Sequence, residues 1–122
     1  MDTKVLVGAA FWDRARQGMR TAGLFNLTVR SGEWEQVTSG LPEDVEVRCI
    51  AIRESGTIYV GTQDGPCRSD DGGRSWQLLE LPGVDRLVWS ILPCDSNILY
   101  VGTLGTSIYR SDDDGESASI AI

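Results

Sequence analysis

The chain of 122 residues has the length of one ordinary domain, and 41% hydrophobic with 24% charged residues is typical of a soluble globular protein. Eleven Lys and Arg against eighteen Asp and Glu give a net charge of −7, which argues against binding to nucleic acid or anionic membranes. Histidine is absent, which excludes Ser-His-Asp and Cys-His catalysis and His-ligated metal sites.

The N-terminal residues predict a cytoplasmic protein. An acid, Asp2, stands where a secretion signal has positive charge, and the apolar run that follows is too short for a signal peptide. No stretch of the sequence reaches the roughly 20 apolar residues that cross a bilayer, so we expect no membrane contact. The cysteines have no zinc-binding spacing and are expected to be buried small hydrophobic residues: Cys49, Cys67 and Cys94.

The sequence repeats itself with a period of about 42 residues. The Tyr-Val-Gly-Thr stretch at residues 59–62 returns at residues 100–103, and residues 68–75 return in altered form at residues 110–117. A weaker copy precedes both, because Val7-Gly8 matches the Val-Gly pair and residues 23–34 align with residues 65–76. This period is typical of a four-stranded propeller blade and predicts one propeller segment with blades at residues 1–41, 42–82 and 83–122.

Within each repeat the pattern predicts short antiparallel strands. The first blade is expected to contribute its second, third and fourth strands only. The innermost strands of the next two blades are expected at residues 47–52 and 88–92, the second strands at 57–62 and 98–103, the third at 66–69 and 107–111, and one fourth strand at 76–80. The sum is an all-β chain of about ten strands, or about two and a half blades. Residues 118–122 alternate only weakly and lack the expected tryptophan and turn signal, so they indicate at most one poor further strand, which is not counted.

Residues 10–22 interrupt the first repeat with a connection much longer than its counterparts. We expect a polar loop there, or a short helix over residues 11–19. Long insertions in a regular repeat often carry function, and arginines beside a tryptophan bind carboxylates, phosphates or acidic partners. The alternative is a solvated loop whose charges aid solubility. The candidate partner-binding residues are Trp12, Asp13, Arg14, Arg16 and Arg20.

Two further arginines, Arg48 and Arg53, lie in or beside a predicted innermost strand. One interpretation is that one of these arginines lines a central channel. The alternative is that either arginine lies at the edge of the sheet.

Residues 69–76 combine Ser, Asp, Gly and Ser at alternate positions, followed by Trp. This pattern resembles the Asp box, or BNR repeat, of sialidases, sortilin-type receptors, some endoglucanase-like glycosidases and photosystem II assembly factors. A second copy ends in Ala118 instead of tryptophan, and the first repeat keeps only Trp34. The resemblance implies a partial β-propeller, with a structural Asp box formed by Ser69, Asp71, Gly73, Ser75, Trp76, Ser111, Asp113, Gly115 and Ser117.

The chemistry of these residues indicates a structural role. A carboxylate such as Asp71 accepts backbone N–H bonds of its own turn, and Gly73 adopts a positive φ that other residues resist. The serines add hydroxyl bonds, and Trp76 covers the neighbouring blade. The acidic run 112–114 lacks the later Glu of a calcium-binding EF-hand loop, so we expect no metal and no cofactor.

No catalytic residue emerges from the sequence. A sialidase resemblance would imply an arginine triad, a Tyr-Glu pair and an aspartic acid, but the tyrosines lie in the repeat strands. Asp13, Asp64 and Asp85 are the candidate carboxylates for glycoside hydrolysis, and no spacing pairs them at the roughly 5–10 Å this chemistry needs. The leading interpretation is a non-catalytic scaffold for protein interaction or assembly, and the alternative is part of a glycoside hydrolase propeller.

The chain is short for a closed ring, since six or seven blades need roughly 250–290 residues. We therefore expect it to be the N-terminal part of a longer propeller, or a protomer whose copies close a ring. Its partners would be the remaining blades, further copies or another protein.

Overall fold

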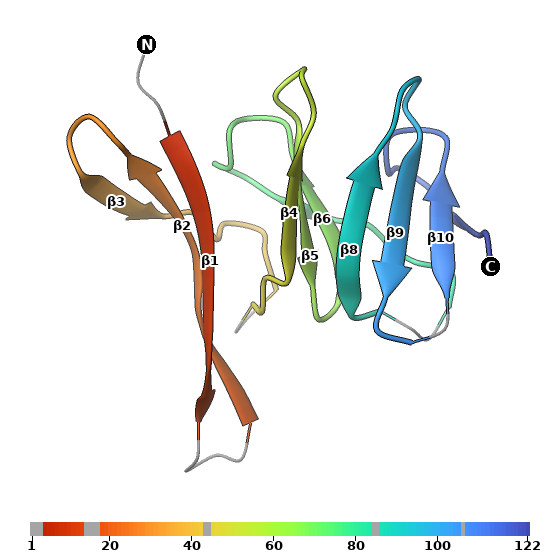
Figure 1. Ribbon diagram of the computed structural model, residues 1–122, viewed down its shortest axis with the longest axis horizontal. Coiled ribbons are helices and arrows are strands. Elements are labelled where there is room, and N and C mark those ends of the chain that lie inside the picture. The colour runs from red at the N-terminus through yellow and green to blue at the C-terminus, as the bar shows by residue number, and fades with distance from the viewer. Residues whose placement is uncertain (1–3, 14–17, 43–44, 84–85, 106) are drawn as a thin grey trace.

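A computed structural model describes residues 4–13, 18–42, 45–83, 86–105 and 107–122. They form three antiparallel sheets that stand side by side, and the described residues contain no helix (Figure 1). The all-β prediction is therefore confirmed.

The first sheet has three strands in the order β1-β2-β3. Its strands are β1 (Lys4–Asp13), β2 (Gly18–Thr28) and β3 (Glu33–Gln36). The expected loop or helix at residues 10–22 is wrong, because the two strands continue to pair, with Trp12 opposite Met19 and Asp13 opposite Gly18. Aromatic residues favour a strand over a loop, and Phe11 and Trp12 extend the apolar run of β1.

The second sheet has four strands in the order β4-β5-β6-β7. They are β4 (Cys49–Ile52), β5 (Ile58–Thr62), β6 (Gly65–Ser69) and β7 (Gln77–Leu78). Every residue of β5 is buried, because this strand is covered on both faces by the flanking sheets. The predicted strands match these bounds within a few residues.

The third sheet repeats the second, in the order β11-β10-β9-β8. Its strands are β8 (Val88–Pro93), β9 (Leu99–Thr103), β10 (Ile108–Ser111) and β11 (Ser119–Ile120). Residues 118–122, left out of the predicted strand count, do contain a strand: Ser119 and Ile120 pair with Arg110 and Tyr109. The missing tryptophan did not prevent this pairing, since strand pairing uses backbone groups.

Two apolar cores hold the sheets together. Between the first and second sheets lie Leu24, Val37, Ile58, Val60, Cys67 and Trp76. Between the second and third lie Tyr59, Leu79, Leu81, Val88, Leu99, Val101 and Tyr109. Successive residues of β5 therefore enter opposite cores, as the two-residue period of a strand requires.

Glycines at matching positions let the sheets approach closely. A Cβ atom at Gly8 would lie 2.9 Å from Cβ of Val47, and one at Gly61 would lie 2.6 Å from Cγ1 of Val88. The Val-Gly repeat seen in the sequence therefore marks the place where a valine, Val47 just before β4 or Val88 at the start of β8, packs on the backbone.

Candidate functional site

The turn between β6 and β7 is closed by hydrogen bonds among the residues of its sequence motif. The Ser69 hydroxyl donates to Asp71 Oδ1 at 2.8 Å and accepts the Gly73 N–H at 2.9 Å. Asp71 Oδ1 also accepts the Ser75 N–H at 2.9 Å, and its Oδ2 accepts the Ser75 hydroxyl. Gly73 has φ of 95°, a left-handed conformation that favours glycine.

The turn between β10 and β11 repeats this network. Ser111 donates to Asp113 Oδ1 at 2.7 Å and accepts the Gly115 N–H at 2.8 Å. Ser117 donates its N–H to Asp113 Oδ1 at 2.8 Å and its hydroxyl to Oδ2. The structure thus brings together the residues singled out in both motifs.

These bonds fix the charge of the two aspartates. Bonds from the Ser75 hydroxyl and N–H, then from Ser69, lower the pKa of Asp71 to about 2. Bonds from Ser117 and then Ser111 lower the pKa of Asp113 to about 2. Each carboxylate stays ionised at neutral pH and so cannot serve as a general acid.

Trp76 joins the second sheet to the first. Its side chain is buried, and its indole N–H donates to the carbonyl oxygens of Val37 at 3.0 Å and Gly73 at 3.1 Å. Its backbone N–H donates to Ser39 O at 2.9 Å. Ala118 holds the matching place in the third sheet and packs against the core between the second and third sheets.

Asp114 is the contact point between the second and third sheets. The Tyr59 hydroxyl donates to Asp114 Oδ1 at 2.6 Å, and Arg68 Nη1 donates to Asp114 O at 2.8 Å. Burial, followed by the bond to Asp114, raises the pKa of Tyr59. The φ of Asp114 is 63°, so the turn is held in a conformation that non-glycine residues seldom adopt.

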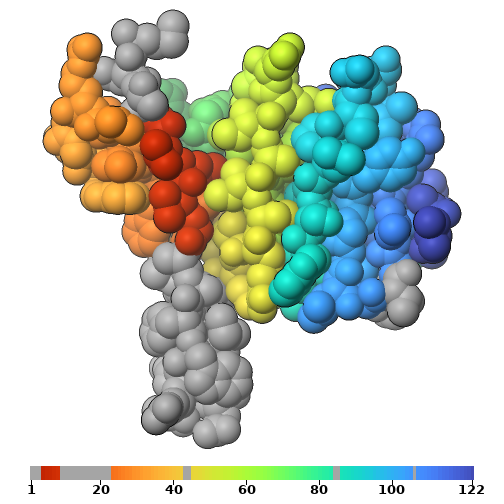
Figure 2. All heavy atoms as spheres, in the orientation of Figure 1, coloured from red at the N-terminus to blue at the C-terminus, as the bar shows by residue number. Residues whose placement is uncertain are grey.

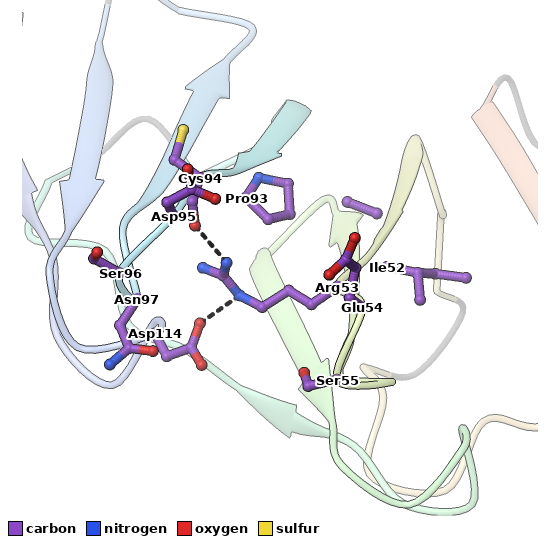
Figure 3. A pocket seen from close by; sticks show the side chains of 11 residues that line it. Ile52, Arg53, Glu54, Ser55, Pro93, Cys94, Asp95, Ser96, Asn97 and Asp114 are labelled. Atoms are coloured by element: carbon purple, nitrogen blue, oxygen red, sulfur yellow. Dashed lines mark hydrogen bonds and ion pairs between the residues drawn. The ribbon is translucent and has the colours of Figure 1, made fainter.

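Arg53 crosses between the same two sheets (Figure 3). It donates to Cys94 O at 2.6 Å and Ile98 O at 2.8 Å, and its Nε lies 2.6 Å from Asp114 Oδ1 in an ion pair outside hydrogen-bond geometry. A hollow of about 550 Å³ surrounds this side chain. Arg53 therefore links the second and third sheets, a contact that the sequence did not predict.

The predicted partner-binding residues fall on the hairpin of β1 and β2. Trp12 and Asp13 lie in β1, and Arg20 lies in β2 opposite Phe11. The backbones of these three residues are therefore paired between the two strands. Arg14 and Arg16 lie outside the described residues. The hairpin extends past the ends of the neighbouring strands, on the side of the β9–β10 turn (Figure 1).

An exposed tryptophan on that side was not singled out from the sequence. The register of β8 against β9 shifts between Val88 and Ser90, which makes Trp89 a bulge residue with 53% of its surface exposed. The Arg48 guanidinium lies 5.4 Å from the centre of the Trp89 ring and forms an ion pair with Glu46. Leu104, which is 60% exposed, lies next to the start of β8, because its N–H donates a hydrogen bond to Leu87 O.

We call Arg48, Trp89 and Leu104 the bulge patch. A β-bulge re-aims one side chain and often occurs beside a functional site. The same irregularity exists in β4, where the Arg48 N–H donates to Gly61 O although Gly61 pairs with Cys49. The sequence offered one signal for this patch: Arg48 and Trp89 hold the same position in two successive repeats.

Other kinds of site are not evident in the part of the chain that the structure describes. No group of three or more His, Cys, Asp or Glu side chains is placed to hold a metal ion among these residues. Within the same ranges, no helix is long and apolar enough to cross a membrane.

Comparison with solved structures identifies the fold. The chain matches the extracellular domain of BT4673 from B. thetaiotaomicron with a TM-score of 0.65 and 20% identity, over 84% of this chain and 15% of that one. It also matches YCF48 in a structure with bound D1 peptide, with a TM-score of 0.65 and 18% identity, over 96% of this chain and 44% of that one. The fold is β-propeller-like.

The chain spans less than half the length of either matched structure. No protein-family model matches the sequence, and a search of the curated proteins also gives no match.

Proposed function

We propose that the chain is a segment of an Asp-box β-propeller that serves as a non-catalytic scaffold for a protein partner. Its sheets would be three successive blades at residues 1–41, 42–82 and 83–122, the first with three strands. The hydrogen-bond networks around Asp71 and Asp113 support this assignment, because they occur at the same place in two sheets and serve only the turn itself.

The observation that carries the proposal is the exposed Trp89 beside Arg48. Tryptophan and arginine dominate binding energy at protein interfaces, where an aromatic ring is desolvated and a guanidinium forms several hydrogen bonds. Because Trp89 lies in a bulge of strand β8, its exposed ring is positioned before a partner binds. The bulge lies where β8 pairs with the last residue of β9, at the opposite end of the sheet from the turn between β10 and β11. The β1–β2 hairpin extends on the same side as the bulge (Figure 1).

The similarity to YCF48 supports a protein partner, since that protein was solved with a bound D1 peptide. At 18% identity the inference rests on the fold and not on matching contact residues.

The alternative, part of a glycoside hydrolase, needs two carboxylates that face one substrate. Asp71 and Asp113 instead face their own serines and are ionised, and of the three carboxylates considered from the sequence the structure describes the side chain of Asp64 alone. Turnover of a panel of sialosides and glucans by the purified chain would favour this alternative.

A peptide-display selection on the immobilised chain tests the scaffold proposal. Selected peptides are then measured against the variants Trp89→Ser and Arg48→Ala. Trp34→Ser is the matched control, because Trp34 is also an exposed tryptophan, at 58%, but lies on β3. We expect Trp89→Ser to weaken binding about tenfold or more and the control to bind normally. Equal binding by all three variants would contradict the proposal.

A further inference from the structure

Three matching positions carry opposite chemistry in the second and third sheets. Cys49 pairs with Gly61 as Ser90 pairs with Gly102, so the two sheets can be aligned residue by residue at this end. In the second sheet the three positions hold polar residues, which we call the polar set: Glu46, Arg48 and Gln63. In the third sheet they hold apolar residues, which we call the apolar set: Leu87, Trp89 and Leu104.

The polar set is bonded within itself. Gln63 Oε1 accepts the Glu46 N–H at 2.8 Å, and the Glu46 carboxylate accepts a hydrogen bond from Arg48 Nη2 in an ion pair. The Glu46 side chain is only 12% exposed and that of Arg48 28%, so salt screens this pair less than a fully exposed one. The charge of Arg48 is therefore compensated before any partner binds.

The apolar set offers surface to a partner. Trp89 and Leu104 are each more than half exposed, and the Leu104 N–H donates to Leu87 O at 3.0 Å. The nearest charged residues along the chain, Asp64 and Arg86, are both exposed and have opposite signs. What this place presents is therefore apolar side chains among charges that compensate one another.

The two sets lie on neighbouring sheets that both have four strands. Strands β4 and β8 contact each other and run side by side (Figure 1). In the space-filling view the yellow segment that contains β4 meets the teal segment of β8 at the surface (Figure 2). The Arg48 guanidinium bridges the two sheets, because it lies over the Trp89 ring at 5.4 Å from its centre.

We propose that Glu46 and Gln63 are positioning residues that compensate the Arg48 charge and hold its guanidinium over Trp89, so that the bulge patch selects an apolar side chain of its partner. This inference rests on the proposed scaffold function and names the chemistry of the partner.

The physical reason is competition for one guanidinium. An aliphatic or aromatic side chain of the partner would pack against Trp89 and Leu104, where removal of apolar surface from water gives affinity. A partner carboxylate would lose its own hydration and would have to compete with Glu46 for Arg48. An acidic side chain therefore gains little at this patch.

Competitive display of two peptide libraries on the immobilised chain tests this selection. The libraries are random peptides of equal length that differ only in the central residue, which is leucine in one and glutamate in the other. We expect leucine-centred peptides to be enriched about tenfold over glutamate-centred ones on the chain. On the Trp89→Ser variant this preference should disappear.

Glu46→Gln is the decisive variant, because it removes the compensating charge and keeps the size of the side chain. Arg48 can then pair with a partner carboxylate, so the preference for leucine should fall to about twofold or less. Glu54→Gln is the matched control: it removes one negative charge from an exposed residue beyond the other end of β4 and should leave the preference unchanged. Arg48→Met keeps a long uncharged side chain beside Trp89 and should retain the preference even if Glu46→Gln does not fold.

The salt dependence of binding gives a second readout. The most enriched leucine-centred peptide is labelled with fluorescein and titrated with the chain by fluorescence anisotropy. Its dissociation constant should change less than about threefold between about 50 and about 500 mM sodium chloride, because little charge is paired on binding. Weakening of about tenfold or more over this range would overturn the inference.

The outcomes separate this inference from the scaffold proposal. Binding that depends on Trp89 but prefers glutamate would overturn the inference alone. An equal preference for leucine on the chain and on Glu46→Gln would show that Glu46 has no positioning role. Binding that is unchanged on Trp89→Ser, or no enrichment of either library, would contradict the scaffold proposal and the inference with it.

Discussion

Replacement of Trp76 by phenylalanine tests whether the indole N–H holds the first two sheets together. Trp76 is 6% exposed and its N–H serves the carbonyl oxygens of Val37 and Gly73. Leaving buried acceptors without a donor costs about 1–3 kcal/mol, and the smaller ring leaves a cavity worth about 1–2 kcal/mol more. We therefore expect Trp76→Phe to lower the free energy of unfolding by about 2–5 kcal/mol.

Urea unfolding followed by circular dichroism measures this change. With a slope of about 2 kcal/mol per molar urea, the midpoint should fall by about 1–2.5 M. Trp34→Phe is the matched control, because this ring is 58% exposed and its replacement should change stability by no more than about 0.5 kcal/mol. Equal midpoints for the two variants would refute the role assigned to Trp76.

Three further outcomes follow from the hydrogen bonds and burial. Folding lowers the pKa of Asp71 and Asp113 to about 2, so the stabilisation that these carboxylates give above about pH 4 should be lost as the pH falls towards 2. In urea unfolding measured at several pH values, replacing both residues by asparagine should make the free energy of unfolding depend less on pH in this range. Burial raises the pKa of Cys67 to about 12, so a thiol reagent at pH 8 should modify partly exposed Cys94 and leave Cys67 intact until the chain unfolds. Tyr59→Phe should cost about 1–3 kcal/mol by thermal unfolding, and an unchanged midpoint would count against the Asp114 contact.

The repeat made most of the fold predictable. Residues 58–62 and 99–103 share a Tyr-Val-Gly-Thr pattern, and both proved to be the second strand of a sheet. Where one copy lacked its marker, the prediction failed. Ala118 stands in place of tryptophan, so β11 is left out of the predicted strand count, although its pairing with β10 depends on backbone groups alone.

Contacts between sheets were not predictable from a repeat read by itself. Arg53 reaches three groups of the third sheet, at Cys94, Ile98 and Asp114, and no residue spacing encodes how two sheets stack. The long connection at residues 10–22 predicts a loop, but its length alone does not reveal that β1 and β2 extend into it and pair. The exposure of Trp89 depends on a bulge, in which one extra residue of β8 shifts its register against β9. The cytoplasmic location stays a prediction.

Hydrogen–deuterium exchange of the chain with and without a selected peptide decides whether a partner binds at the bulge patch. If the chain is a scaffold that binds through the bulge patch, the peptide should slow exchange in residues 46–50, 86–90 and 103–105. Exchange in the turns at residues 70–75 and 112–117 should stay unchanged. Protection confined to those turns, with none at the bulge patch, would show that the chain does not bind its partner through this patch.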